Sequence, residues 1–156
     1  MKVLIVDAFS GSASGRRAFA KFEKVVRLAF QAVERHEEGR TEFVVRHFRK
    51  GLEDLCYDNE QAGLSSKAAV AAVDKLDFVF IDGDSRILPW HPRAHKLVVF
   101  LRTVIGARKC LFASGPGAHV VAYICATGGK ALRVLNGGGD GGSLLDLSSL
   151  RPEHLG

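Results

Sequence analysis

The residues best suited to chemistry lie in and around a turn of small residues, Ser114-Gly115-Pro116-Gly117. A short apolar run precedes the turn, and a helix is predicted after it over residues 118–127. A strand, a sharp glycine turn and a helix together make a nucleophile elbow, which presents a catalytic side chain at its apex. Ser114 is therefore a candidate nucleophile, and His119, one helical turn further on, is its candidate base. Serine more often hydrogen-bonds its own turn or caps the helix in this setting, and we favour that role.

Carboxylates also occur at predicted strand ends. Asp7 and Asp82 each close an apolar run, and Asp84 follows shortly after. Hard divalent cations prefer oxygen ligands, so a cation site is one hypothesis. The layout also resembles response-regulator receiver domains, in which Asp82 would accept the phosphoryl group, but the lysine of that family would align near Asn136. We favour the simpler interpretation that these carboxylates cap loops, and we expect no metal ion.

A loop rich in small polar residues follows the first predicted strand. It contains Ser10, Ser12, Ser14 and Gly15, and Arg16 comes directly after it. Backbone N–H groups at a helix N-terminus can cradle phosphate, and the loop resembles the phosphate loop of flavodoxins in composition. A module that binds a nucleotide or a flavin is therefore an alternative function. Such loops are common in this architecture without a ligand, and we expect no cofactor.

Several other side chains invite a chemical interpretation. Cys110 and Cys125 lie within apolar patterns, and we expect both to pack in the core rather than to act as nucleophiles. His91 and His95 are four residues apart, but no third ligand is indicated, so we expect surface histidines. Trp90, the only tryptophan, lies in a loop between two prolines. It predicts either a protein-contact surface or a plug over the sheet.

The elements that must position these residues alternate between strand and helix. Apolar runs predict strands over residues 2–7, 42–48, 78–82, 110–113 and 131–135, the second of them nearer an edge. Apolar spacing of three and four residues predicts helices over residues 16–36, 68–73, 94–105 and 118–127. The first helix is expected to bury Phe19, Phe22, Val26, Ala29, Phe30 and Val33. Residues 49–63 are expected to be a long connection, with one helical turn near residues 52–56.

This alternation predicts a parallel sheet with helices on both faces, joined by right-handed crossovers. In such sheets, binding sites lie outside the carboxyl ends of the strands. The candidate ligand-binding residues at that edge are Asp7, Ser10, Ser12, Ser14, Gly15, Arg16, Asp82, Gly83, Gly115 and Gly117. We expect a single domain over residues 1–150 and a loose tail over residues 151–156, because the length suits one core.

Three segments resemble the class I glutamine amidotransferases. Residues 3–10 are similar to the opening strand of that family, and residues 78–83 resemble the strand that leads to its oxyanion loop. Residues 114–123, followed by Gly128-Gly129-Lys130, resemble its cysteine-bearing elbow, helix and Gly-Gly turn. The resemblance implies an α/β domain with a flavodoxin-like three-layer sandwich of about five parallel strands.

The catalytic residues of that family are missing from the matching positions. Its cysteine would fall on Gly115, and its glycine-rich oxyanion loop would fall on residues 83–85. Its histidine and glutamate have only a faint echo, in Arg151-Pro152-Glu153. Without a thiolate and a base, no acyl-enzyme can form. We therefore predict a pseudoenzyme that binds a protein partner in an assembly, with a small hydrolase or transferase that uses Ser114 and His119 as the alternative.

Composition and charge narrow the remaining possibilities. The net charge of +5 is compatible with a small anionic ligand, but no block of Lys and Arg with interleaved aromatics predicts specific nucleic-acid binding. No apolar run reaches the ~18 residues of a membrane span. The odd number of cysteines, three, suits reduced thiols and a cytoplasmic protein. Another protein is the favoured partner, and the sequence leaves the oligomeric state open.

Overall fold

The computed structural model describes residues 1–34, 40–56, 66–84 and 88–127. In chain order its elements are β1 (Lys2–Asp7), α1 (Ala13–Glu34), β2 (Glu42–His47), α2 (Ser66–Asp74), β3 (Phe78–Asp82), the 3-10 helix η1 (Pro92–Ala94), α3 (His95–Gly106), β4 (Cys110–Ala113) and α4 (Gly115–Thr127). Strands and helices alternate, which confirms the α/β class. The predicted strand over residues 131–135 and the predicted tail lie outside the described residues.

The four strands form one parallel sheet in the order β2-β1-β3-β4. The register pairs Asp7 with Asp82, and Ile81 with Ala113, so the carboxyl ends of β1, β3 and β4 are neighbours. Residues 3–6 of β1 are completely buried, because this strand has neighbours on both sides and side chains above and below it. That burial explains its unbroken apolar run. β2 ends the strand order and is more exposed, as its more polar sequence predicted.

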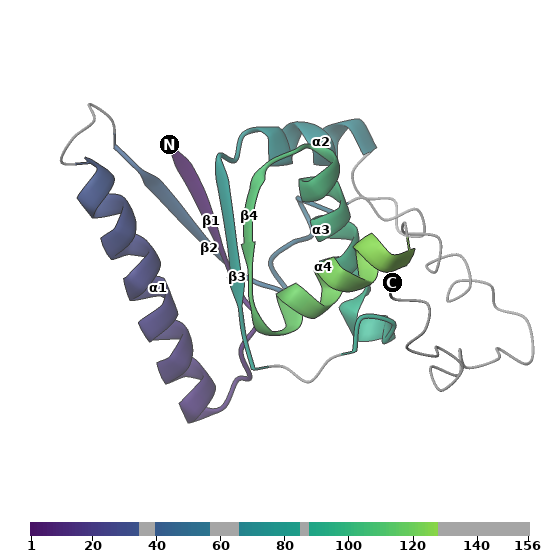
Figure 1. Ribbon diagram of the computed structural model, residues 1–156, viewed down its shortest axis with the longest axis horizontal. Helices are drawn as coiled ribbons and strands as arrows, with labels where there is room; N and C mark the ends of the chain where they lie inside the picture. Colours follow the sequence, from purple (N-terminus) through teal and green to yellow (C-terminus); the bar gives the residue numbers. More distant parts are fainter. Residues whose placement is uncertain (35–39, 57–65, 85–87, 128–156) are drawn as a thin grey trace, which may run out of the picture.

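α1 packs against one face of the sheet (Figure 1). Phe30 is central to this contact, because its ring centroid lies 5.2 Å from that of Phe78 and 5.8 Å from that of Phe80. Ala29 and Val33, which were predicted to be buried, are exposed. The helix has 22 residues and rises about 33 Å, against about 20 Å for a six-residue strand, so α1 is longer than the strands it covers.

α2, α3 and α4 cover the opposite face (Figure 1). The main core lies between these helices and the sheet. Leu4 and Ile81 from the strands meet Leu97 and Leu101 from α3 and Val120 from α4, and each of these side chains is at most 2% exposed. The described helices therefore cover the two faces unequally, with α1 alone on one of them.

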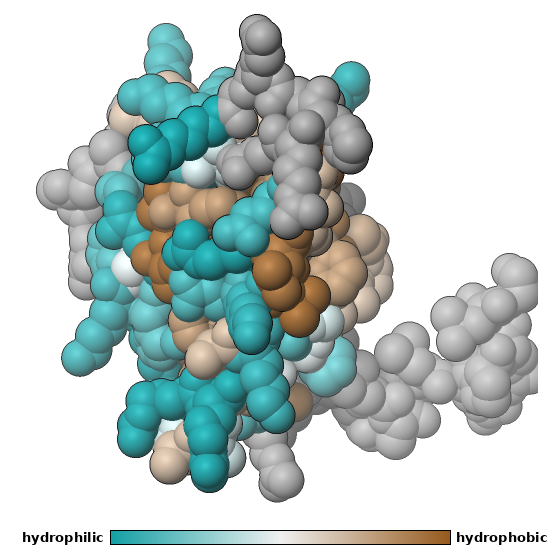
Figure 2. Space-filling model, turned by 90° about the vertical axis from the view of Figure 1, so that its left-hand side faces the viewer, coloured by the Kyte–Doolittle hydropathy of each residue, from teal (hydrophilic) through white to brown (hydrophobic). Residues whose placement is uncertain are grey.

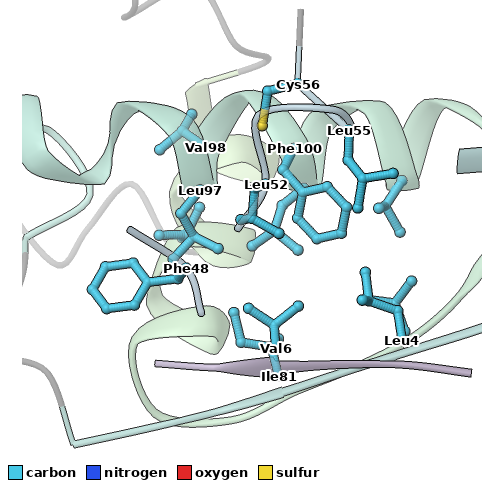
Figure 3. Packing of buried hydrophobic residues seen from close by; sticks show 14 of the residues in the cluster. Leu4, Val6, Phe48, Leu52, Leu55, Cys56, Ile81, Leu97, Val98 and Phe100 are labelled. Carbon is cyan, nitrogen blue, oxygen red and sulfur yellow. The ribbon is translucent and has the colours of Figure 1, made fainter. Parts of the chain in front are cut away.

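Residues 48–56, which follow β2, also belong to this core (Figure 3). Phe48, Leu52, Leu55 and Cys56 are all buried, and they pack between the sheet and α3. The Leu55 N–H donates to the Leu52 carbonyl at 3.0 Å, so the chain turns back here. The sequence predicted a connection with one turn near residues 52–56, and the turn is present, but its burial was missed, because its apolar side chains follow neither a strand nor a helix period.

The prediction that Cys110 and Cys125 pack in the core is wrong. Both are exposed, and Cys56 is the buried cysteine. Cys110 pairs with Phe78 in the register, so it points to the face that carries α1. Cys125 lies near the end of α4, one residue after the buried Ile124. An apolar neighbourhood in sequence does not reveal which side of an element is covered.

Candidate functional site

The structure brings Asp7, Asp82 and Ser114 to one edge of the sheet. The Ser114 N–H donates to the Ile81 carbonyl at 2.9 Å, and the Ala8 N–H donates to the Asp82 carbonyl at 3.0 Å. These bonds extend the parallel ladders one residue past the strands. The edge is the one at which parallel sheets usually bind ligands. Asn136, which directly follows the strand predicted over residues 131–135, lies outside the described residues.

Ser114 is held by its own turn and by Asp82. Its hydroxyl donates to Oδ1 of Asp82, and the same oxygen accepts the N–H of Gly83 at 2.8 Å. The Ser114 carbonyl accepts the N–H of Gly117 at 3.1 Å, at the start of α4. No hydrogen bond joins Ser114 to His119, both of which the structure describes. A carboxylate is a weak base at neutral pH, so the Ser114–Asp82 pair suits a structural role better than activation of a nucleophile.

The apex of the elbow is Gly115, and there is no room for a side chain on it. Its φ of +53° lies in the left-handed region that other residues rarely adopt. A Cβ atom placed on Gly115 would lie 2.3 Å from the carbonyl oxygen of Gly83, a distance that real Cβ atoms do not reach. The backbone of a nucleophile elbow is therefore present, but a neighbouring carbonyl fills the place from which the nucleophile would project.

Gly83 and Gly117, two other candidate residues, also serve close protein contacts. A Cβ atom on Gly83 would lie 2.1 Å from the Ala8 carbonyl oxygen, and one on Gly117 would lie 2.6 Å from Cγ2 of Ile81. The first contact joins the ends of β1 and β3 backbone to backbone. The contact between Gly117 and Ile81 lets α4 pack directly against β3. Around Gly115, backbone atoms of the neighbouring loop therefore fill the space at this edge of the sheet.

Ser10, Ser12 and Ser14 form a chain of hydroxyl groups before and within the first turn of α1. Their Oγ atoms are separated by 2.8 Å and 2.9 Å in turn. Ser12 is the N-cap, because its Oγ accepts the N–H of Gly15 at 3.0 Å, and this cap explains why α1 begins at Ala13. Gly15 packs against the loop, since a Cβ atom there would lie 2.1 Å from the Ser10 carbonyl oxygen.

Asp84 already takes the hydrogen bonds that a bound anion would need from this loop. Ser10 donates both its N–H and its hydroxyl to the Asp84 carboxylate, the hydroxyl at 2.9 Å. Arg16 donates to the carbonyl of Gly11 rather than pointing to an open cradle. A phosphate would have to displace the carboxylate and would be repelled by its charge.

The carboxylates each serve a different loop. Oδ1 of Asp7 accepts the N–H of Phe9 at 2.9 Å, whereas Asp82 serves Ser114 and Asp84 serves Ser10. Among the residues that the structure describes, no three His, Cys, Asp or Glu side chains lie close enough to hold a metal ion. The carboxylates therefore act here as caps for the loops at this edge.

The His91 and His95 pair also lacks the character of a metal site. Nδ1 of His91 accepts the N–H of Arg93 at 3.1 Å, which occupies one of its two ring nitrogens. His91 is exposed and His95 is partly buried in the first turn of α3.

An exposed apolar surface, which we call the Trp90 surface, is formed by Leu88, Trp90 and Tyr123. Leu88 is 52% exposed and Trp90 is 37% exposed, and the Trp90 ring centroid lies 6.2 Å from that of Tyr123 on α4. Burial raises the pKa of the Tyr123 phenol, because its ionised form loses hydration. Trp90 was singled out by sequence alone. Tyr123 carried no signal, since only the fold brings it to the loop that holds Leu88 and Trp90.

A shallow depression of about 410 Å³ lies on the outer side of α1. All of its lining residues come from this one helix: Ala20, Glu23, Lys24, Arg27, Leu28 and Gln31. It is therefore the space between neighbouring side chains of an exposed helix, and it contains none of the candidate residues at the carboxyl edge of the sheet.

No protein-family model, curated protein or solved structure matches this chain. None of the helices in the described ranges is long and apolar enough to cross a lipid bilayer.

Proposed function

We propose that this chain is a degenerate amidotransferase-like domain that acts by binding another protein and does not hydrolyse glutamine. The parallel strand order β2-β1-β3-β4 and the left-handed glycine between β4 and α4 support the likeness. The proposal includes the finer architecture of that family, a flavodoxin-like three-layer sandwich with a fifth parallel strand. It rests on the strand order and the elbow, together with the sequence resemblance.

The observation that carries the proposal is the contact between Gly115 and the Gly83 carbonyl. A cysteine or serine at position 115 would need to place its Cβ atom 2.3 Å from that oxygen. An oxyanion hole also requires N–H groups that point to the reacting centre, whereas here a carbonyl oxygen faces it. The Gly83 carbonyl therefore leaves no room for a nucleophilic side chain at position 115, and it would repel a negatively charged intermediate there.

The Trp90 surface is the proposed binding region. Exposed aromatic side chains next to other apolar residues are typical of the energetically important centre of protein interfaces. The Trp90 ring lies beside that of Tyr123, and this contact reduces the conformational entropy that a partner's binding would cost. The arrangement favours a protein partner over a small ligand, because the side chains form an open surface.

Catalysis is tested by incubating the purified chain with glutamine, with a nitrophenyl ester and with a serine-directed fluorophosphonate probe. We expect no ammonia, no ester turnover beyond the buffer rate, and no labelling. Labelling or turnover that disappears in Ser114→Ala would overturn the proposal and support a small hydrolase, for which the Ser114–Asp82 contact is the starting observation. A thermal shift with FMN or a nucleotide would instead support the alternative of a ligand-binding module.

Binding is tested by cross-linking the chain to its neighbours in cells and comparing Trp90→Ala with a matched control. Leu28→Ala is the control, because it also removes a large exposed apolar side chain (Leu28 is 52% exposed), but one that lies on α1. We expect a defined partner that Leu28→Ala retains and Trp90→Ala loses by at least tenfold. Equal retention by both variants would exclude the Trp90 surface as the binding region.

A further inference from the structure

The outer side of α1 carries a line of exposed basic residues. Arg17, Lys21, Lys24 and Leu28 follow one another at spacings of four, three and four, so they lie on one side of the helix, opposite the buried Val26. All four are exposed to solvent. Figure 2 views the molecule from the side on which α1 lies and shows teal hydrophilic side chains with brown apolar surface between them. We call Arg17, Lys21 and Lys24 the basic stripe.

No acidic side chain of α1 balances the basic stripe. Glu23 is the only acidic residue before the last residue of the helix, and it forms an ion pair with Arg27 at 2.7 Å. None of the ion pairs in the described parts of the chain involves the stripe. Residues three or four apart on a helix have Cβ atoms about 5–6 Å apart, less than the ~8 Å Debye length at physiological salt. The three charges can therefore act together on one ligand.

The stability of the helix does not explain these charges. The first turn of α1 has no acidic residue, and Arg16 and Arg17 lie near its N-terminus, where the helix dipole disfavours positive charge. Lys21 is four residues from Arg17 and three residues from Lys24, and like charges at these spacings also destabilise a helix. The basic stripe therefore lowers the stability of the free helix, and an anionic ligand would remove this cost.

Apolar surface borders the basic stripe. Leu28 continues the stripe by one turn and is 52% exposed, and Val25 beside it is 65% exposed. The shallow depression on α1 has Ala20, Lys24 and Leu28 among its lining residues, so an apolar side chain of a ligand can lie there next to a basic group. A ligand that fits this side of α1 therefore combines anionic groups with an apolar side chain.

We infer that the outer side of α1 binds an acidic amphipathic helix of another protein. Such a helix, with Asp or Glu at spacings of three and four, places its carboxylates opposite the basic stripe and an apolar side chain against Leu28. Nucleic acid offers phosphates but no aliphatic side chain, and a bilayer is a broad plane, whereas these charges form a single line. The Trp90 surface includes α4, on the opposite face of the sheet, so this inference does not depend on the proposed function.

The test is fluorescence anisotropy with a labelled helical peptide that carries glutamates at spacings of three and four and a leucine one turn beyond them. The wild-type chain is expected to bind this peptide at least fivefold more tightly than a shuffled peptide of the same composition. Lys21→Glu combined with Lys24→Glu is expected to weaken binding at least tenfold. The matched control is Arg102→Glu combined with Arg108→Glu, which changes the net charge equally at exposed positions within and after α3, and it should change affinity less than twofold.

Several outcomes would overturn the inference. Equal weakening by the two charge-reversed variants would show attraction to net charge alone, and equal binding of the shuffled peptide would show that the spacing is not recognised. Absence of binding to either peptide would also overturn it, as would binding only to phosphatidylserine vesicles or to a DNA duplex. Trp90→Ala should bind the peptide as wild type does, so a failure of the proposed function would leave this result unchanged. Loss of peptide binding in Trp90→Ala would place the acidic ligand elsewhere.

Urea denaturation separates binding from folding. Lys21→Glu combined with Lys24→Glu removes the like-charge contacts with Arg17, so its urea midpoint is expected at or above that of wild type while its peptide affinity falls. If the midpoint falls instead, Lys21→Gln combined with Lys24→Gln replaces this variant, because it removes the charges without adding new ones. Peptide affinity that stays within twofold of wild type in a folded variant of either kind would overturn the inference.

Discussion

At the scale of single residues, the site is defined by close backbone contacts that leave no space for a side chain at position 83 or 115. Gly83 and Gly115 meet so closely that the carbonyl of one occupies the side-chain position of the other. Ser114 and Asp82 complete the turn through a hydrogen bond. These residues have the layout of a catalytic elbow, but their contacts connect the end of β3 to the start of α4.

The Gly115 contact predicts a large loss of stability in Gly115→Ala. We expect roughly 2–4 kcal/mol, because a left-handed φ is combined with a backbone clash that cannot relax by rotating a side chain. Gly106→Ala in α3 is the matched control: nothing lies within 4 Å of a Cβ atom there, and its change should stay within about 1 kcal/mol. Urea denaturation of both variants measures the difference. Equal stability would show that position 115 does accommodate a side chain.

The Ser114 contact predicts a modest loss of stability and no change in any activity. Removing a hydroxyl that donates to a carboxylate costs about 1–2 kcal/mol, since the bond is assisted by charge. Ser114→Ala should show this loss in urea, and in an Asp82→Ala background the same substitution should cost much less. An additive pair of substitutions would contradict the coupling of these two side chains.

At the scale of elements, sequence predicted much of the fold. The buried strands β1 and β3 have continuous apolar runs, so their positions could be predicted from these runs alone. The helix ends were less accurate, since α1 starts at a serine cap that the apolar spacing does not show. The candidate residues could be placed at one edge because the carboxyl ends of parallel strands lie at the same edge of a sheet. The Gly83–Gly115 contact could not be predicted, because it depends on how closely two loops approach.

The segment after β2 shows what apolar periodicity misses. Leu52 is completely buried between the sheet and α3, although its segment has no regular period. Leu52→Ala should therefore cost about 2–4 kcal/mol, the range for a leucine deleted from a packed core. Leu28→Ala, with a leucine 52% exposed on α1, is the control and should change stability by less than about 0.5 kcal/mol. Similar midpoints in urea for the two variants would show that the segment is not part of the core.

α4 carries a prediction about pH. Burial raises the pKa of Tyr123, so the folded state holds the phenolic proton more tightly than the unfolded state. The stability that this provides is complete below the ordinary tyrosine pKa and is lost as pH rises through the folded-state value. Trp90→Ala should bring the pKa of Tyr123 back toward its ordinary value, because it removes the ring 6.2 Å away. Absorbance titration in a Tyr57→Phe background isolates Tyr123, since the chain has two tyrosines. An unchanged pKa would show that other residues exclude water from Tyr123.

At the scale of the whole molecule, the described helices cover the two faces of the sheet unequally, and the described strands differ in how many neighbours they have. β1 and β3 lie between two strands each, whereas β2 and β4 end the described strand order. An end strand can lose its hydrogen bonds by local opening, but an inner strand opens only when the sheet comes apart.

Native-state hydrogen exchange should therefore separate the strands. The amides of β1 and β3 are expected to exchange only by global unfolding, with protection equal to the stability measured in urea. Those of β2 should exchange faster, since it has one neighbouring strand and is partly exposed along its length. β4 gives the most informative result. Fast exchange there agrees with a strand that ends the sheet, whereas protection as high as that of β3 would mean that a further strand pairs with it.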